Sequence, residues 1–176
     1  MGKYIIIACL LFRSLSAFSQ TDWVKKDLGS KVQVKFPNTP TYKLNGKAGT
    51  YTAKTKNNLF IVIVQYDVIP YYSDFLKFSN LQKAKMIDIF LDNAVKGMLT
   101  YSGNDEVPFT SIKIGNYAGR ETSYNAINPV TGENTKYFCK LISVFNKLVT
   151  LQCIYLREDQ ECETEKNVFL NSITSN

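Results

Sequence analysis

A glycine-rich segment followed by an arginine is the first feature of this sequence that could do chemistry. The segment Gly115-Asn116-Tyr117-Ala118-Gly119 precedes Arg120 and Glu121, and glycines beside a cation can cradle a phosphate group. A phosphate-binding loop, however, needs Gly-Lys-Ser or Gly-Lys-Thr leading into a helix, whereas a strand is expected after Arg120. The sequence therefore predicts a structural turn. Arg120 and Glu121 have three possible interpretations. They form a local ion pair, belong to a surface cleft, or face solvent as ordinary residues of an exposed strand.

The absence of histidine excludes several classes of enzyme. The chain contains no histidine, so it has no Ser-His-Asp or Cys-His arrangement, no histidine zinc site and no imidazole base for neutral pH. Asp159, Glu161, Glu163 and Glu165 lack the spacing of a calcium loop. They suit the positive end of a helix dipole instead. We therefore predict no catalytic, metal-binding or cofactor-binding residue.

The cysteines allow at most one internal disulfide in the mature chain. Cys139, Cys153 and Cys162 contain no Cys-x-x-Cys pair, which argues against a zinc knuckle or a thioredoxin-like motif. Cys139 and Cys153 lie on the two arms of a predicted hairpin that turns at Asn146-Lys147. That register directs their sulfur atoms to opposite faces, so a disulfide between them would require a loop one residue longer. Cys153 with Cys162, across the strand-to-helix turn, is the remaining candidate disulfide.

The first nineteen residues have the pattern of an export signal. Lys3 precedes the apolar run Tyr4–Phe12, and Ala17-Phe18-Ser19 has the small-x-small form that signal peptidase accepts. We expect cleavage between Ser19 and Gln20, which leaves residues 20–176 as the mature chain, in the periplasm or outside the cell. The apolar run is too short for a permanent membrane-spanning helix.

A lipoprotein signal is the alternative. Ile6-Ile7-Ala8-Cys9 fits a lipobox, in which Cys9 would carry the lipid. Only a short apolar segment would then precede Cys9, so we favour cleavage after Ser19.

The mature chain is of a size and charge typical of one exported domain. Removing 19 of 176 residues leaves 157, which is enough for one domain with its own core. Lys3 and Arg13 are lost with no acid, so the formal charge falls from +6 to +4. This charge does not suit a nucleic-acid-binding protein.

Hydrophobic periodicity predicts an α+β fold. Residues 31–36 alternate between apolar and basic or polar side chains, which indicates a half-buried strand. Residues 59–68 are apolar on both faces, which favours a central strand covered on both sides. Residues 74–99 carry an apolar stripe at steps of three and four, typical of a helix that Ser79 or Asn80 could cap. The remaining predicted elements are strands over 46–55, 120–127, 136–145 and 148–156, and a second helix over 159–176.

Three further segments carry an expectation, and two of them have two interpretations. The aromatic approach to the first helix, Pro70-Tyr71-Tyr72, either packs by its rings or lines a cleft. The last helix is expected to turn Val168, Phe169 and Ile173 towards the sheet. From Lys25 to Lys56 the chain has eight lysines and one acid, which would attract an acidic partner or anionic lipid, or would protect a sheet edge from aggregation.

The order of these elements resembles the PsbP-like family. The similar features are Phe-Pro-x-x-Pro at Phe36–Pro40, Ile-x-Ile-Gly-x-Tyr-x-Gly-Arg-Glu at Ile112–Glu121, an aromatic hairpin, and Phe-Leu-x-Ser-Ile at Phe169–Ile173. The resemblance covers about residues 31–174 and implies an antiparallel sheet covered by helices, an α/β/α sandwich. Members of this family act as binding or assembly factors, and they include small exported bacterial proteins.

We therefore predict an exported, non-enzymatic binding or assembly module for a protein or small ligand of the cell envelope. Its candidate cleft or interface residues are Tyr71, Tyr72, Arg120 and Glu121. The alternatives are a small-ligand carrier with a cavity between sheet and helix and, less favoured, an enzyme that uses carboxylates or tyrosines. Convergent polar side chains with strongly shifted pKa values would favour the enzyme.

Overall fold

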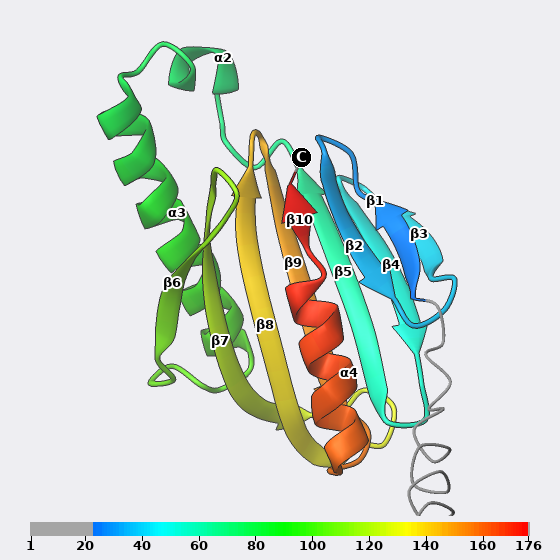
Figure 1. Cartoon of the computed structure of the whole chain (residues 1–176). Helices are drawn as coiled ribbons and strands as arrows, with labels where there is room; N and C mark the ends of the chain where they lie inside the picture. The colour runs from blue at the N-terminus through cyan, green and yellow to red at the C-terminus, as the bar shows by residue number, and fades with distance from the viewer. Residues whose placement is uncertain (1–22, 176) are drawn as a thin grey trace, which may run out of the picture.

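The computed structural model describes residues 23–175, which fold into two antiparallel sheets and three helices (Figure 1). This confirms the predicted α+β class. The predicted signal peptide, its cleavage site at Ser19 and Gln20, and the alternative lipid attachment at Cys9 lie outside the described residues. The elements in chain order are β1 (Val24–Asp27), β2 (Val32–Phe36), β3 (Thr41–Asn45), β4 (Ala48–Lys54), β5 (Asn58–Tyr66), α2 (Tyr72–Phe75), α3 (Asn80–Tyr101), β6 (Phe109–Ile114), β7 (Tyr117–Ile127), β8 (Asn134–Val144), β9 (Lys147–Tyr155), α4 (Gln160–Asn171) and β10 (Thr174–Ser175).

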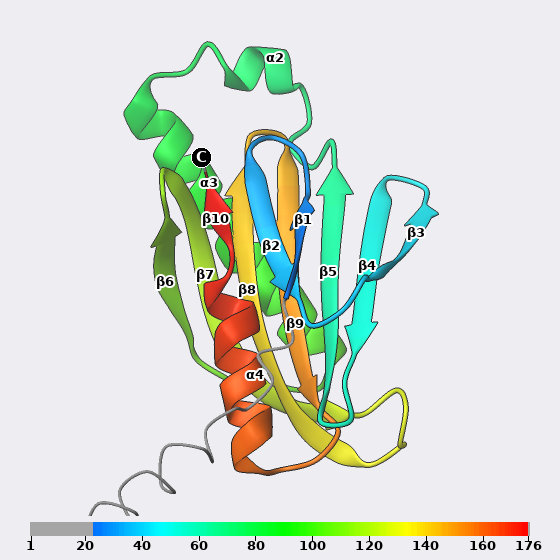
Figure 2. The same cartoon turned by 45° about the vertical axis from the view of Figure 1, so that its right-hand side comes forward.

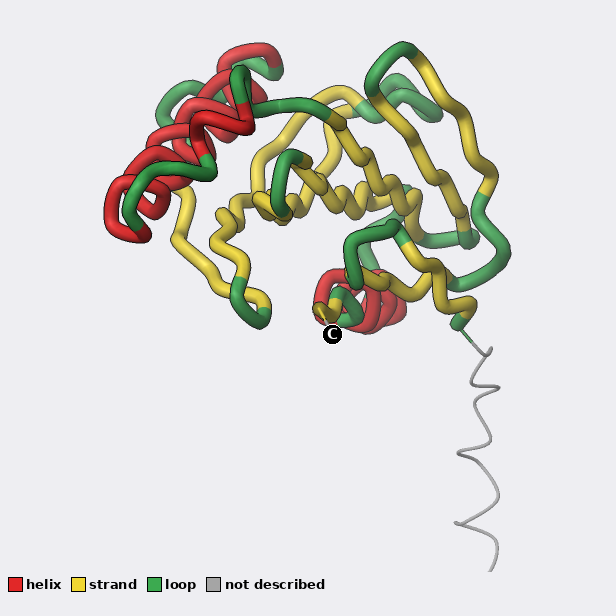
Figure 3. Tube along the Cα trace, turned by 90° about the horizontal axis from the view of Figure 1, so that it is seen from above, coloured by secondary structure: helices red, strands yellow, loops and turns green. Residues whose placement is uncertain are grey.

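The large sheet has seven strands in the order β3-β4-β5-β9-β8-β7-β6, and all its neighbours are antiparallel. Its central strands β5, β9 and β8 are apolar on both faces, as was expected for residues 59–68. Seen from above, the sheet curves into an arc with a concave and a convex face (Figure 3). Each face buries its own hydrophobic cluster.

The concave face holds α4 and the small sheet β1-β2-β10 (Figures 1 and 3). β2 alternates as predicted, with Val32, Val34 and Phe36 buried. The rings of Phe36 and Phe60 both pack on Phe169 of α4, with centroids 5.6 and 4.9 Å away. β10 pairs with β2, so the last strand of the chain closes against one of the first.

The convex face is covered over β7 and β8 by α3. Leu91 and Val95 of the predicted apolar stripe are fully buried there. Leu99 is buried with them, whereas the stripe was expected to end at Met98, which is only half-buried. The Ser79 hydroxyl accepts from the backbone N–H of Gln82, and the Gln82 side chain accepts from the N–H of Ser79, which completes a capping box. The predicted Ser79 cap is thus confirmed. Neither α3 nor any other helix within residues 23–175 combines the length and hydrophobicity that crossing a bilayer requires.

α2 and the first turn of α3 extend past the end of the large sheet (Figures 1 and 2). The segment that leads to α2 is held by the β8–β9 turn, because the backbone N–H of Ile69 donates to the side chain of Asn146 at 2.8 Å. Leu81 belongs to the predicted stripe, yet it is 81% exposed because no strand lies beneath it. The helix therefore has an unsupported end.

Three local predictions were wrong. The β8–β9 hairpin turns at Phe145-Asn146, with Val144 opposite Lys147, and not at Asn146-Lys147. The last helix ends at Asn171, and Val168 faces solvent, while Phe169 and Ile173 are buried as predicted. The edge strand β3 was missed because its residues are all exposed and show no burial pattern.

Candidate binding cleft

A cleft of about 350 Å³ lies where α2 and the beginning of α3 face the end of the large sheet. The sheet contributes the β6–β7 turn, the start of β7 and the end of β8. The cleft therefore sits between helix and sheet. Its lining residues are Tyr72, Phe75, Asn80, Lys83, Ala84, Ile87, Asp88, Asn116, Tyr117, Ala118, Ser143 and Phe145.

Two pairs of aromatic rings form opposite sides of this cleft. Tyr72 and Phe75 of α2 are stacked, with ring centroids 5.7 Å apart and planes 19° from parallel. Tyr117 and Phe145 on the sheet side meet edge to face, with centroids 5.7 Å apart. Aromatic walls of this kind suit a flat apolar ligand, because rings attract one another by stacking and by edge-to-face contact.

Ser143 gives the cleft a polar group with nothing bound to it. Its side chain is only 4% exposed, and its hydroxyl oxygen has no hydrogen-bond partner among the described residues. A buried hydroxyl without a partner costs about 1–3 kcal/mol relative to one that is satisfied. Ser143 also lines the cleft, so a bound molecule whose polar group reached this buried hydroxyl would remove that cost.

Arg120 of β7 fixes the α3 wall of the cleft. Its Nε donates to Asp92 Oδ1 at 2.7 Å, and its Nη2 donates to Asp88 Oδ1 at 3.1 Å. Asp88 and Asp92 are one helical turn apart, so one guanidinium joins both to the sheet. Burial alone would lower the pKa of Arg120, but the hydrogen bonds to Asp92 and Asp88 outweigh it and raise the pKa. Arg120 thus stays charged, and the cleft residue Asp88 is held in place.

Left-handed backbone conformations flank the cleft. Phe145 has φ 52° and Tyr71 has φ 51°, and neither is a glycine. A bulky residue in this region carries about 1–2 kcal/mol of strain. Phe145 occupies the tight β8–β9 turn, and this conformation directs its ring onto Tyr117. Strain of this kind is concentrated at functional sites in many proteins.

The four residues predicted for a cleft or interface are not brought together in one place. Tyr72 lines the cleft, whereas Tyr71 is 83% exposed beside it. Arg120 is buried beneath α3 and contacts the cleft only through Asp88, so the interpretation of Arg120 as solvent-facing was wrong. Glu121 points to the concave face, where its Oε1 lies 3.7 Å from Lys140 Nζ.

The glycine-rich segment is structural, as predicted. Gly115, with φ 57°, and Asn116 form the tight turn between β6 and β7. A Cβ at Gly115 would meet the Ser175 hydroxyl at 1.9 Å, and one at Gly119 would meet the Leu141 carbonyl at 2.6 Å. Both glycines therefore permit close packing, and Asn116 is the residue of this turn that lines the cleft.

A second, polar hollow lies on the concave side, between β8, β9 and the start of α4. It is lined by Lys136, Phe138, Tyr155, Glu158, Asp159, Glu163 and Lys166. Hydrogen bonds from Lys166 and Tyr155 lower the pKa of Glu163 to about 2. Burial, followed by the bond to Glu163, raises the pKa of Tyr155. Both pKa shifts lead away from neutral pH, so Glu163 and Tyr155 are poorly suited to proton transfer at neutral pH.

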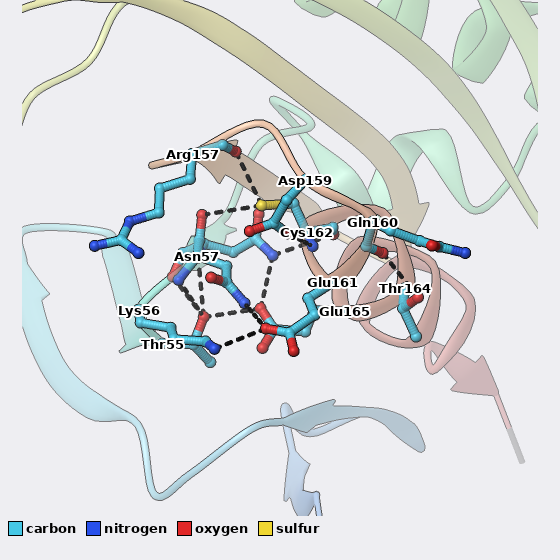
Figure 4. A network of polar contacts seen from close by, with 11 residues as sticks. Thr55, Lys56, Asn57, Arg157, Asp159, Gln160, Glu161, Cys162, Thr164 and Glu165 are labelled. Carbon is cyan, nitrogen blue, oxygen red and sulfur yellow. Dashed lines mark hydrogen bonds and ion pairs between the residues drawn. The ribbon is translucent and has the colours of Figure 1, made fainter. Parts of the chain in front are cut away.

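The acidic residues at the start of α4 anchor the helix to the β4–β5 turn (Figure 4). Asp159 accepts from the backbone N–H of Cys162 at 2.9 Å and so caps the helix. Glu161 contacts Lys56 Nζ at 2.8 Å, and Glu165 accepts from Thr55 Oγ1 at 2.8 Å. These carboxylates are occupied by protein partners. Within residues 23–175, no three acidic or cysteine side chains gather as a metal site would require.

The candidate disulfide between Cys153 and Cys162 is not formed in the structure. Both residues, like Cys139, are buried free thiols. The Cys162 thiol donates to the carbonyl of Arg157 at 2.9 Å, and the Cys153 sulfur lies 3.7 Å from the Asn58 side-chain oxygen. Burial raises the pKa of all three thiols, that of Cys139 to about 12.

Sequence reasoning found Tyr72 but missed the rest of the cleft. Ser143 lies in an apolar run, where one serine is an ordinary strand residue. Phe145 and Asn116 lie in hairpin turns whose contacts depend on the placement of α2. The one available signal was the spacing of Asp88 and Asp92 at the border of the apolar stripe, which indicates a cation opposite them.

No family model and no curated protein matches this chain. Among solved structures, it is similar to a crystal structure from Bacteroides thetaiotaomicron at 11% sequence identity, with a TM-score of 0.35. The similarity covers 83% of this chain and 45% of that one. The chain therefore spans less than half the length of that protein. A TM-score this low assigns neither fold nor function.

Proposed function

We propose that this protein is an exported, non-enzymatic binding protein that holds a small ligand in the cleft between α2, α3 and the large sheet. The observation that carries the proposal is the buried Ser143 hydroxyl, which has no partner and lines an aromatic cleft. The ligand that fits is a flat apolar ring system with one hydroxyl or carbonyl group. The rings of Tyr72, Phe75, Tyr117 and Phe145 would pack on the ring system, and Ser143 would bond to the polar group.

The groups around the cleft favour binding over catalysis. Asp88 is the carboxylate of the cleft, and Arg120 holds it as an ion pair. Asp88 therefore has a structural role, because it joins α3 to the large sheet through Arg120. A nucleophilic serine needs a hydrogen bond to a base, and the Ser143 hydroxyl makes none among the described residues.

Export and membership of the PsbP-like family belong to the same proposal. Export is supported by the apolar run Tyr4–Phe12 and by the small residues before Gln20. The family is supported by the motifs at Phe36–Pro40, Ile112–Glu121 and Phe169–Ile173, and by helices on both faces of an antiparallel sheet. Known members of that family act through binding, which is the kind of role proposed here.

The test uses 2-naphthol, a fused ring with one hydroxyl, and naphthalene, the same ring system without it. The chain beginning at Gln20 is titrated with each compound. Ser143→Ala is expected to weaken 2-naphthol binding about fivefold, the equivalent of one lost hydrogen bond, and to leave naphthalene binding unchanged.

Ser123→Ala, an exposed serine on β7, is the matched control and should bind both compounds as the original chain does. If neither compound binds, or if Ser143→Ala binds 2-naphthol as tightly as the original chain, the proposal is wrong. Native mass spectrometry of freshly purified protein would then show whether a chemically different ligand is retained.

A further inference from the structure

The helical tip, residues 71–86, carries large apolar side chains that the fold does not cover. It comprises α2, the link to α3 and the first turns of α3, and it extends past the end of the large sheet (Figures 1 and 2). Tyr71 and Leu81 are more than four-fifths exposed, Leu76 is about half exposed, and Phe78 is 41% exposed. Single exposed apolar residues are common on protein surfaces. Four within eleven consecutive residues at one end of a molecule require an explanation.

The same segment is basic. It contains Lys77, Lys83 and Lys85 and a single acid, Asp74. The carboxylate of Asp74 lies 2.7 Å from Lys77 Nζ, but both side chains are well exposed, so water screens the pair. Lysines beside exposed apolar and aromatic side chains are the combination that binds anionic lipid surfaces, because each lysine is attracted to the headgroups while the apolar groups enter the interface.

The shape of the tip favours a membrane over a protein partner. A stable protein interface buries about 800 Å² on each side over a broad matched surface. The tip is a projecting end with five exposed apolar side chains, Met86 included, which is small for such an interface. A projecting end can enter the headgroup layer of a bilayer without a matching surface.

We propose that the helical tip docks this protein on an anionic membrane surface, with Leu76, Phe78 and Leu81 entering the interface and Lys77 and Lys85 contacting headgroups. This inference goes beyond the proposed binding function and does not depend on it. The two are connected in space, because Tyr72 and Phe75 of the tip also line the cleft. A docked tip would hold the opening of the cleft at the membrane surface.

The experiment measures co-sedimentation of the chain beginning at Gln20, which contains every described residue, with lipid vesicles. One set of vesicles contains equal parts of phosphatidylcholine and phosphatidylglycerol, and the other contains phosphatidylcholine alone. We expect binding to the anionic vesicles that weakens as salt is added. Leu81→Glu should weaken it at least about tenfold, as expected for loss of one inserted leucine. Lys77→Gln and Lys85→Gln should each weaken it about fivefold.

Matched variants elsewhere on the surface distinguish docking by the tip from nonspecific hydrophobic adsorption and from general electrostatic attraction. Ile127→Glu changes an apolar residue that is 65% exposed at the end of β7, whereas the cleft is lined by the start of that strand. Lys43→Gln removes an exposed lysine from β3, in the basic N-terminal third. Both should bind vesicles as the original chain does. A urea unfolding curve for each variant confirms that it is folded.

Three results would overturn the proposal. The first is equal binding to both kinds of vesicle. The second is an equal loss of vesicle binding in Lys43→Gln and Lys85→Gln, which would indicate general charge attraction without a docking site. In the third, the chain does not bind vesicles, and a protein of the cell envelope binds the original chain but not the Leu81→Glu variant. That outcome would assign the tip to a protein interface.

Discussion

Arg120 and its two carboxylates should respond very differently to mutation, depending on which partner is removed. The Arg120 side chain is 5% exposed, while those of Asp88 and Asp92 are 57% and 40% exposed. Replacing both aspartates with alanine leaves a buried guanidinium without a counter-charge. Replacing Arg120 with methionine leaves two carboxylates that water already reaches.

The magnitudes follow from this difference in burial. An uncompensated buried charge costs about 3–5 kcal/mol, and Arg120 cannot shed its proton to avoid the cost. The two Asp→Ala changes also stabilise α3 by about 1 kcal/mol, because alanine has a higher helix propensity than aspartate. Asp88→Ala/Asp92→Ala should therefore destabilise the fold by about 2–4 kcal/mol. Arg120→Met should cost about 1–2 kcal/mol, because methionine fills the buried space and the carboxylates stay hydrated.

Urea unfolding of the chain beginning at Gln20 measures these free energies directly. Asn93→Ala, on the solvent face of α3, gives the gain from helix propensity alone and serves as the control. Adding Arg120→Met to the double alanine variant should restore part of its lost stability, since the unpaired charge is then absent. If Arg120→Met costs as much as the double alanine variant, the assignment of Arg120 as the buried partner that governs stability is wrong.

Three further outcomes are expected. In urea unfolding, Ser143→Ala should raise the free energy of unfolding of the ligand-free chain by about 1 kcal/mol, because it removes a buried hydroxyl without a partner. A loss of stability would mean that the hydroxyl has a hydrogen-bond partner in solution. The pKa of Glu163 is lowered from 4.5 to about 2, so its ionised form stabilises the fold. The loss of unfolding free energy caused by Glu163→Gln should therefore shrink as the pH falls from 4.5 to 2. A loss that does not depend on pH would contradict the ion pair with Lys166. Iodoacetamide should leave Cys139, Cys153 and Cys162 unmodified in the folded chain at pH 8 and should alkylate all three after unfolding without reductant. Alkylation of Cys139 alone would instead reveal the disulfide between Cys153 and Cys162.

The central strands and α3 were predictable because burial imposes a period on the sequence. Residues 59–68 are apolar on both faces because helices lie on both sides of the large sheet, and residues 84–99 repeat at helical spacing because one face of α3 is buried. β3 lacked such a signal, since it lies at an edge and buries neither face. The hairpin turn was misplaced because Asn146 is a favoured turn residue, whereas the left-handed residue that starts the turn is Phe145.

The cleft could not be predicted because its parts are joined only by tertiary structure. Arg120 alternates along β7 like a solvent-facing residue, and only the placement of α3 buries it. Ser143 and Phe145 gain their role from α2, whose position depends on the contact between Asn146 and Ile69. Sequence spacing describes one element at a time, whereas this site is formed where four elements meet.

The pairing of β10 with β2 has a consequence for how the chain reaches its native state. The backbone N–H of Lys35 donates to the Ser172 hydroxyl across 137 residues, and Ser175 lies opposite Val32. The concave core therefore cannot close until residues 172–175 have joined β2. Contacts between such distant segments slow folding, because the intervening chain must first be ordered. Slow closure of the concave core is compatible with the proposed export, because a chain that folds slowly can be translocated before it folds.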